Sequence, residues 1–284
     1  MSAAGDPATT APLIPAVQAR NLSKVFNARR PNAVDALVDV DLTVEPGEFV
    51  SLIGPSGCGK STALRLIANL LEPTSGDVLV NGKPARTARL DQDYGMAFQQ
   101  AGLFDWRTVG RNIELPLELK GWEKTKRGTR ALEMLDLVKL TEFADHYPWQ
   151  LSGGMQQRVA IARALAAHPP LLLMDEPFGA LDEMTREHMQ AELLRICGET
   201  ATTVVFVTHS TPEAVYLSTR VVFMSPRPGR ITDVVDVDLG AKRGLDTRED
   251  PAFFKKITEV REALRGTEKA GASVADLPAG IEDR

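Results

Sequence analysis

Cysteine is scarce in this sequence, which has only Cys58 and Cys197 among its 284 residues. Two thiols form at most one bridge, and this excludes the disulfide-rich frameworks that stabilise small secreted domains. The first residues have neither the basic start nor the apolar stretch of a signal peptide. The sequence therefore predicts a protein of the reducing cytosol.

Long apolar runs are also missing. Segments such as Leu171–Met174 and Val204–Val207 have the length of buried strands. They are far shorter than the roughly 18 consecutive apolar residues of a membrane-spanning helix. We therefore expect a chain that does not itself cross a membrane.

The sequence also lacks an excess of basic residues. The chain has 33 Lys and Arg against 38 Asp and Glu, a formal net charge of −5, and no long basic run. Proteins that bind nucleic acid usually carry a basic footprint, so nucleic acid is not an expected partner. The 43% of apolar residues can supply a substantial core.

The order of predicted elements indicates an α/β protein. Residues 1–16, rich in Ala, Pro and Thr, are expected to be a disordered tail, and the main domain is expected over residues 17–240. An N-terminal β-subdomain precedes a mainly helical subdomain at about residues 100–166. Strands are expected at Val17–Phe26, Val34–Val44, Phe49–Ile53 and Asp77–Val80, with a helix over Lys60–Leu71.

Strands and helices alternate after the helical subdomain, which predicts parallel strands joined by crossover helices. Strands are expected at Leu171–Met174, Thr203–Thr208, Val221–Met224 and Asp233–Leu239, and helices at Met184–Cys197 and Pro212–Ser218. The C-terminal part, residues 241–284, matches no motif. It is expected to hold an amphipathic helix over Ala252–Leu264 and a loose tail from Gly266, a structural part more than a regulatory one.

A glycine-rich loop follows the third predicted strand and opens the first predicted helix. Its sequence GPSGCGKS fits the pattern G-x-x-x-x-G-K-S/T. Glycines let backbone N–H groups turn toward an anion, and the helix N-terminus adds a positive dipole end. The context predicts a P-loop NTPase core of the RecA-like type that binds ATP and Mg²⁺. The expected nucleotide-binding residues are Gly54, Pro55, Ser56, Gly57, Cys58, Gly59, Lys60, Ser61 and Thr62.

Two acidic residues end a predicted apolar strand at Asp175 and Glu176. Ligands of parallel sheets bind at this edge of the sheet. Asp175 is expected to hold Mg²⁺ together with the Ser61 hydroxyl, and Glu176 to activate the attacking water. The alternative is an acidic loop with no chemical role.

A second glycine-rich helix start, LSGGMQQR, spans residues 151–158. Ser152 and the free N–H groups behind it can face an anion, although an ordinary helix cap has the same composition. One chain needs only one phosphate loop. A second such site therefore suggests that two chains share the nucleotide.

These motifs and their order resemble the ABC transporter ATPase family, from Val17 to about Leu239. The resemblance implies a homodimer with two ATP molecules in its interface. Each ATP would lie between the phosphate loop of one chain and Ser152, Gly153 and Gly154 of the other.

The same resemblance implies roles for four single residues. Gln99 would link Mg²⁺ and the attacking water to the membrane partner, and His209 would contact the γ-phosphate. Asp182 would lie at the dimer seam. Phe26 would stack on adenine, with simple core packing as its alternative, and an ordinary surface position is the alternative for His209.

Residues 103–108, 180–186 and 225–231 resemble the nitrate/sulfonate/taurine branch of importers, whose relatives also handle pyrimidine precursors. The branch implies peripheral attachment at the cytoplasmic face to integral membrane permease subunits, which receive a small anionic or heterocyclic solute from a solute-binding protein. Leu103, Phe104 and Trp106 are expected in the permease groove, with burial in the helical subdomain as the alternative.

A soluble ABC ATPase of translation or DNA maintenance is the alternative function. Such proteins usually join two ATPase halves or insert a long coiled coil. This chain has one set of motifs, with about 90 residues and no sustained heptads between Ser61 and Leu151.

Overall fold

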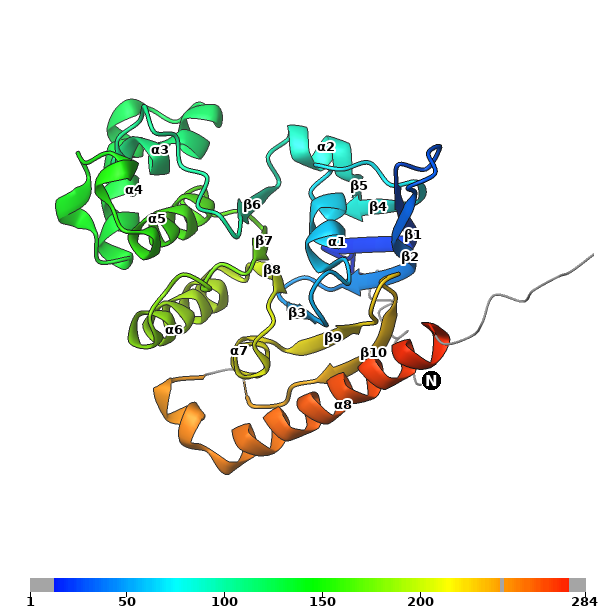
Figure 1. Ribbon diagram of the computed structural model, residues 1–284. Helices are drawn as coiled ribbons and strands as arrows, with labels where there is room; N and C mark the ends of the chain where they lie inside the picture. The colour runs from blue at the N-terminus through cyan, green and yellow to red at the C-terminus, as the bar shows by residue number, and fades with distance from the viewer. Residues whose placement is uncertain (1–12, 241–242, 276–284) are drawn as a thin grey trace, which may run out of the picture.

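The computed structural model describes residues 13–240 and 243–275, arranged around a six-stranded sheet (Figure 1). Most of the expected N-terminal tail lies outside these residues. Its last residue, Ala16, is buried, and its N–H donates a 2.8 Å hydrogen bond to the carbonyl of Val44. Within these ranges, no helix combines the length and apolar character that a bilayer-spanning segment requires.

The six-stranded sheet is parallel except for one edge. Its order is β10 (Ile231–Asp236), β9 (Arg220–Met224), β3 (Phe49–Ile53), β8 (Thr203–Val207), β7 (Leu171–Asp175) and β6 (Tyr94–Ala97), and only β10 pairs antiparallel. This confirms the α/β class. The parallel arrangement brings the carboxyl ends of β3, β7 and β8 to one edge, where ligands of such sheets bind.

The N-terminal strands form a separate antiparallel sheet, as the sequence predicts. Its order is β2 (Val34–Val44), β1 (Val17–Phe26), β4 (Ser75–Val80) and β5 (Lys83–Pro84). Helix α1 (Lys60–Ile67) lies between the two sheets, and the short α2 (Ala85–Leu90) follows β5 (Figure 1).

A helical lobe is inserted between β6 and β7. It consists of α3 (Val109–Leu119), α4 (Lys124–Leu137), the short turns η1 (Thr141–Phe143) and η2 (Pro148–Gln150), and α5 (Gly153–Leu165). Figure 1 shows this lobe on the opposite side of the molecule from the antiparallel sheet. Ile113, Leu135 and Val159, one from each helix, are completely buried. The predicted helical subdomain therefore has a well-packed interior.

Three further helices complete the core. Helices α6 (Glu183–Thr200) and α7 (Thr211–Leu217) follow β7 and β8. After the short η3 (Leu245–Glu249), helix α8 (Pro251–Ala275) runs beside α7, β9 and β10 (Figure 1).

The expectation of a loose tail from Gly266 is wrong for the residues up to Ala275, because α8 continues through them. Thr267 is buried, and its hydroxyl lies 3.1 Å from that of Thr232 and donates to the carbonyl of Ala263. The Thr232–Thr267 contact joins α8 to β10 at a point past Leu264, where the predicted apolar pattern of the helix ends. The rest of the expected tail, residues 276–284, lies outside the described residues.

Other element boundaries differ from the sequence predictions. Helix α1 ends at Ile67 and not at Leu71, because Asn69 has a left-handed φ of 49°. The N–H groups of Leu70 and Leu71 then both donate to the carbonyl of Arg65. Strand β10 ends at Asp236 and not at Leu239.

Two hydrophobic clusters cover the two faces of the large sheet. Leu172 and Met174 of β7 belong to the cluster that includes the helical lobe, α6 and α8. Leu171 and Leu173 belong to the other cluster, which includes α1 and the antiparallel sheet. Because side chains alternate along a strand, this pattern fixes the face to which each residue of β7 points.

Candidate active site

A cavity of about 320 Å³ opens at the carboxyl edge of the large sheet, in front of α1. It brings together residues from six separate segments of the chain. These are Phe26, Val34, Ala36, Ser56, Gly57, Gly59, Lys60, Ser61, Thr62, Gln99, Glu176 and Arg227. Most of the phosphate-loop residues that the sequence predicts thus share one hollow with Phe26, Gln99 and Glu176.

The phosphate loop packs tightly against strand β2. Gly59, directly before α1, has a φ of 104°, and a Cβ atom there would lie 2.9 Å from the carbonyl oxygen of Ala36 and 2.6 Å from Cδ2 of Leu37. A side chain at this position is therefore excluded both by backbone conformation and by space. The glycine lets the loop turn sharply into the helix.

The Lys60 ammonium lies inside the loop. It donates hydrogen bonds to the carbonyls of Gly54 (2.7 Å) and Pro55 (3.0 Å). The side chain is buried, so these carbonyls supply the partners that a buried ammonium needs. A phosphate in the cavity can take their place with a full negative charge.

Cys58 differs from its neighbours in the loop. Its side chain is only 1% exposed and packs in the hydrophobic cluster that includes α1, outside the cavity lining. Burial raises the pKa of the thiol, although Lys60 opposes this shift. Its thiol is therefore no candidate for contact with a ligand in the cavity.

The Ser61 hydroxyl donates a 2.7 Å hydrogen bond to Oδ1 of Asp175. Burial raises the pKa of Asp175, and the Ser61 hydrogen bond and Arg65 act in the opposite direction. One hydroxyl and one carboxylate are oxygen donors of the kind that Mg²⁺ prefers when substrate phosphates supply further ligands. In the described part of the chain, no three His, Cys, Asp or Glu side chains cluster as a metal site of their own. The pair therefore fits a cation that is bound jointly with a nucleotide.

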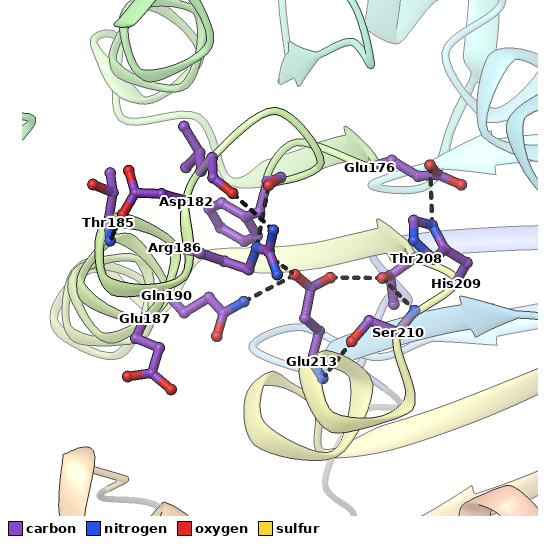
Figure 2. Close-up of polar contacts among 12 residues, drawn as sticks. Glu176, Asp182, Thr185, Arg186, Glu187, Gln190, Thr208, His209, Ser210 and Glu213 are labelled. Carbon is purple, nitrogen blue, oxygen red and sulfur yellow. Dashed lines mark hydrogen bonds and ion pairs between the residues drawn. The ribbon is translucent and has the colours of Figure 1, made fainter. Parts of the chain in front are cut away.

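Glu176 lies between two side chains from other loops. Its Oε2 is 3.2 Å from Nδ1 of His209 and 3.5 Å from Nε2 of Gln99. Figure 2 shows the Glu176–His209 contact in front of the ends of β7 and β8. The backbone of Glu176 has a left-handed φ of 45°, and its N–H donates to the carbonyl of Val207 at 2.9 Å. Glu176 thus lies within 3.5 Å of each of the other two predicted catalytic side chains.

Ser152, Gly153, Gly154 and Asp182, which the family resemblance assigns to the dimer interface, do not line this cavity. Ser152 is exposed and caps α5, because its hydroxyl accepts a hydrogen bond from the Met155 N–H at 3.3 Å. Asp182 is also exposed and caps α6 by accepting from the Thr185 N–H at 3.0 Å, a bond that lowers its pKa. Gly153, behind Ser152, is also exposed.

Phe26 lies at the rim of the cavity and belongs to neither hydrophobic cluster. Core packing, the alternative from the sequence, is therefore wrong. The ammonium of Lys24 lies 5.4 Å from the centre of the ring. A partly exposed ring at this place can stack on a planar ligand.

Arg227 is a cavity residue that sequence reasoning missed. Its Nη2 lies 3.4 Å from the carbonyl oxygen of Gly57, 170 positions earlier in the chain. The available signal was a cationic residue in a Pro/Gly turn just after a strand of the parallel sheet. Such turns supply ligand contacts in open α/β sheets.

A second cavity, of about 370 Å³, lies between β6 and α3. Much of its lining is apolar, with Tyr94, Met96, Phe98, Phe104, Leu115, Pro116 and Leu119. Trp106 stands beside it, 74% exposed, with its ring centre 4.8 Å from that of Phe104. Burial of Trp106 in the helical subdomain is thus wrong, while Leu103 is partly buried against the core.

Comparison with known proteins identifies relatives of the whole domain. The family model described as ABC transporter matches residues 37–179. An uncharacterized ABC transporter ATP-binding protein of Methanocaldococcus jannaschii is 49% identical over 244 residues, 86% of this chain and 90% of the relative. The nitrate import ATP-binding protein NrtD of Synechocystis is 44% identical over 254 residues, 87% of this chain and 94% of that one.

A third relative is the taurine import ATP-binding protein TauB of Roseobacter denitrificans. It is 43% identical over 244 residues, 84% of this chain and 90% of the relative. Among solved structures, a dimeric ATP-binding cassette in a post-hydrolysis state, bound to ADP and Pi, superposes with a TM-score of 0.73. That chain is 37% identical, and the match covers 78% of this chain and 99% of the other.

Proposed function

The chain belongs to the ABC transporter family, and we propose that it powers import of a small anionic or heterocyclic solute through a separate membrane permease. As a member of that family it is an ATPase whose reaction is coupled to transport. One observation carries the proposal most directly. The phosphate loop, the Ser61–Asp175 pair and the Glu176–His209 pair converge on one edge of the sheet.

ATP would bind through its phosphates to the loop of residues 54–61 and to the start of α1. Lys60 would exchange the carbonyls of Gly54 and Pro55 for the β- and γ-phosphates. The Phe26 ring would stack on the adenine at the rim. Arg227 would add a positive charge on the same side of the cavity.

Ser61, Asp175 and Gln99 would hold Mg²⁺, which when bound neutralises charge on the phosphates. Glu176 would orient and deprotonate the attacking water as a general base. His209, whose Nδ1 lies 3.2 Å from Oε2 of Glu176, would contact the γ-phosphate. Each role belongs to a residue that already stands at this edge of the sheet.

A homodimer would complete the site. Ser152 is the exposed N-cap of α5, and Gly153 and Gly154 follow it. The N–H groups at this helix start would face the γ-phosphate of an ATP molecule bound to the second chain. Asp182 would lie at the seam between the chains. The dimeric cassette among the related structures supports this arrangement.

The second cavity would receive a short segment of the permease, which would attach the chain to the cytoplasmic face of the membrane. Gln99 follows Phe98, which lines the second cavity, and its side chain contacts Glu176. A conformational change around Glu176 would therefore be transmitted through Gln99 to the permease segment in that cavity. A solute-binding protein would deliver the cargo on the other side. The names of the nitrate and taurine import relatives support a small cargo that carries an anionic group.

Trp106→Ala tests the docking role. An aromatic anchor of an interface typically contributes about 2 kcal/mol or more, so membrane recovery of the variant should fall strongly. Phe254→Ala is the matched control, because Phe254 is also an exposed aromatic (58%) but lies on α8. Recovery with the membrane fraction and thermal melting are measured together. Unchanged recovery of Trp106→Ala would remove this groove from the permease interface.

The cargo is tested in a strain that lacks this chain. Uptake of labelled nitrate, taurine and a pyrimidine precursor is compared with and without the restored chain. Loss and recovery of uptake for one of them identifies the solute class. Equal uptake of all three in both strains would contradict the proposed cargo.

A further inference from the structure

Glu213, in the first turn of α7, carries a mostly buried carboxylate that lines neither cavity. Its side chain is only 13% exposed. A buried carboxylate is unfavourable unless hydrogen bonds and opposite charge compensate for its lost hydration. Figure 2 shows it between the loop that carries His209 and the start of α6.

The first set of contacts reaches the His209 loop. The Thr208 hydroxyl donates to Oε2 of Glu213 at 2.6 Å, and the Ser210 N–H donates to the Thr208 hydroxyl at 3.0 Å. The N–H of Glu213 in turn donates to the Ser210 hydroxyl at 3.4 Å. Both neighbours of His209 in the chain are therefore held in one ring of hydrogen bonds with Glu213.

The second set reaches the loop that follows Glu176. Nε of Arg186 lies 3.8 Å from Oε1 of Glu213. The same guanidinium donates to the carbonyls of Leu181 (2.7 Å) and Phe178 (3.4 Å). Arg186 thus connects the Glu213 carboxylate to the segment between Glu176 and Asp182.

A third contact extends to the C-terminal part of the chain. Nε2 of Gln190 donates to Oε1 of Glu213 at 3.1 Å, and Arg248 of η3 donates to Oε1 of Gln190. Arg248 also lies over the ring of Tyr216, 3.9 Å from its centre. Arg248, in the C-terminal part of the chain, is therefore linked to Glu213 through the side chain of Gln190.

We propose, on the basis of the proposed function, that Glu213 is a positioning residue that holds His209 in register with Glu176. The carboxylate accepts from Thr208 on the His209 side and faces Arg186 on the Glu176 side, so it joins the two loops. Hydrogen bonds to a charged group are stronger than neutral ones, and burial strengthens them further. Glu213 does not touch the nucleotide in this role and acts only through His209.

Glu213→Gln is the first test. The amide oxygen can still accept from Thr208, but the charge that faces Arg186 is lost. We expect kcat for ATP hydrolysis to fall about tenfold, a change of about 1.4 kcal/mol in the barrier, with KM for ATP within about twofold of wild type. Glu199→Gln is the control, because it removes a carboxylate from an exposed pair with Arg195 on α6. Its kcat should match that of wild type.

A double-mutant cycle separates positioning from a general effect on the fold. In single-turnover assays, adding Glu213→Gln to His209→Ala should change the rate by less than about twofold, because the effect passes through His209. Multiplicative losses would overturn the inference. A lower melting temperature with kcat unchanged would also overturn it. If Glu213→Gln does not fold, Thr208→Val removes the donor at similar volume and should give the same kcat loss.

Wild type and Lys60→Ala are assayed in parallel. Absence of ATP hydrolysis in the wild-type chain would refute the proposed function itself. Normal hydrolysis by wild type, loss in Lys60→Ala and no loss in Glu213→Gln would refute only the positioning role.

Discussion

The Ser61 hydroxyl donates a 2.7 Å hydrogen bond to Oδ1 of Asp175 across 114 positions of sequence. The bond joins the first turn of α1 to the last residue of β7. Two motifs that are separate in the chain therefore meet in one oxygen-rich site. Loss of either partner leaves the other polar group without its hydrogen bond in a largely buried place.

Ser61→Ala should raise the Mg²⁺ concentration that gives half-maximal ATP hydrolysis by at least about tenfold, since the proposed Mg²⁺ site loses one oxygen ligand. Mg²⁺ titration at saturating ATP measures this. Ser61→Thr keeps the hydroxyl and should remain near wild type. An unchanged Mg²⁺ requirement in Ser61→Ala would exclude this hydroxyl as a ligand.

Glu176→Gln should lower ATP hydrolysis by about 10²- to 10⁴-fold, because the carboxylate that activates water is lost. Gln can adopt the same left-handed backbone as Glu, so the melting temperature should hardly change. Because the variant does not hydrolyse its bound ATP, the dimer should accumulate and be detected by gel filtration in Mg-ATP. Hydrolysis at near the wild-type rate would show that Glu176 is not the general base.

Arg227→Gln should raise KM for ATP severalfold, because it removes a positive charge from the lining of the cavity at the carboxyl edge of the sheet. The hydrogen bond from its Nη2 to the Gly57 carbonyl is 3.4 Å long, too long to contribute much stability. Arg261→Gln, on an exposed face of α8, is the control. Steady-state kinetics measures the rise in KM, and thermal melting tests whether stability is unchanged. An unchanged KM would mean that Arg227 does not contact the nucleotide.

Cys197 should make the protein less stable at alkaline pH. Burial raises the pKa of its thiol from 9.0 to about 12, so the folded state holds a proton that the unfolded state loses first. The stability from this group is complete below pH 9 and is lost as the pH rises toward 12. Cys197→Ala should therefore flatten the decline of melting temperature above pH 9. An equal decline in the variant would exclude this thiol as its source.

Several strands were predictable because their apolar residues alternate or run continuously. The bounds of β1, β2 and β3 agree with the sequence predictions. Strand β6 was not predicted, because it has only four residues and contains Gly95. A Cβ atom at Gly95 would lie 2.3 Å from the carbonyl oxygen of Ala164, so glycine is required there by close packing of α5. Local propensity alone cannot reveal such a contact.

The cavity at the carboxyl edge of the large sheet was predictable for a similar reason. The phosphate loop and the Asp175–Glu176 pair are short continuous motifs, each with a strand directly before it. Arg227 and Glu213 were not found, because their partners are distant in the chain or come from separate elements. The length of α8 was also missed, since its last turns are fixed by Thr267 and not by an apolar stripe.

The alternation along β7 gives the direction of Asp175 a simple parity rule. Leu171 and Leu173 face the side of α1, so Asp175, two residues further, points to the same side and meets Ser61. Deletion of one residue within β7 would exchange the two faces, turn the carboxylate toward α6 and bury the wrong side chains in both clusters. Insertion of two residues would keep the side but move the carboxylate by about 6–7 Å, beyond reach of the hydroxyl. The Ser61–Asp175 hydrogen bond therefore depends on the number of residues in the strand as much as on their identity.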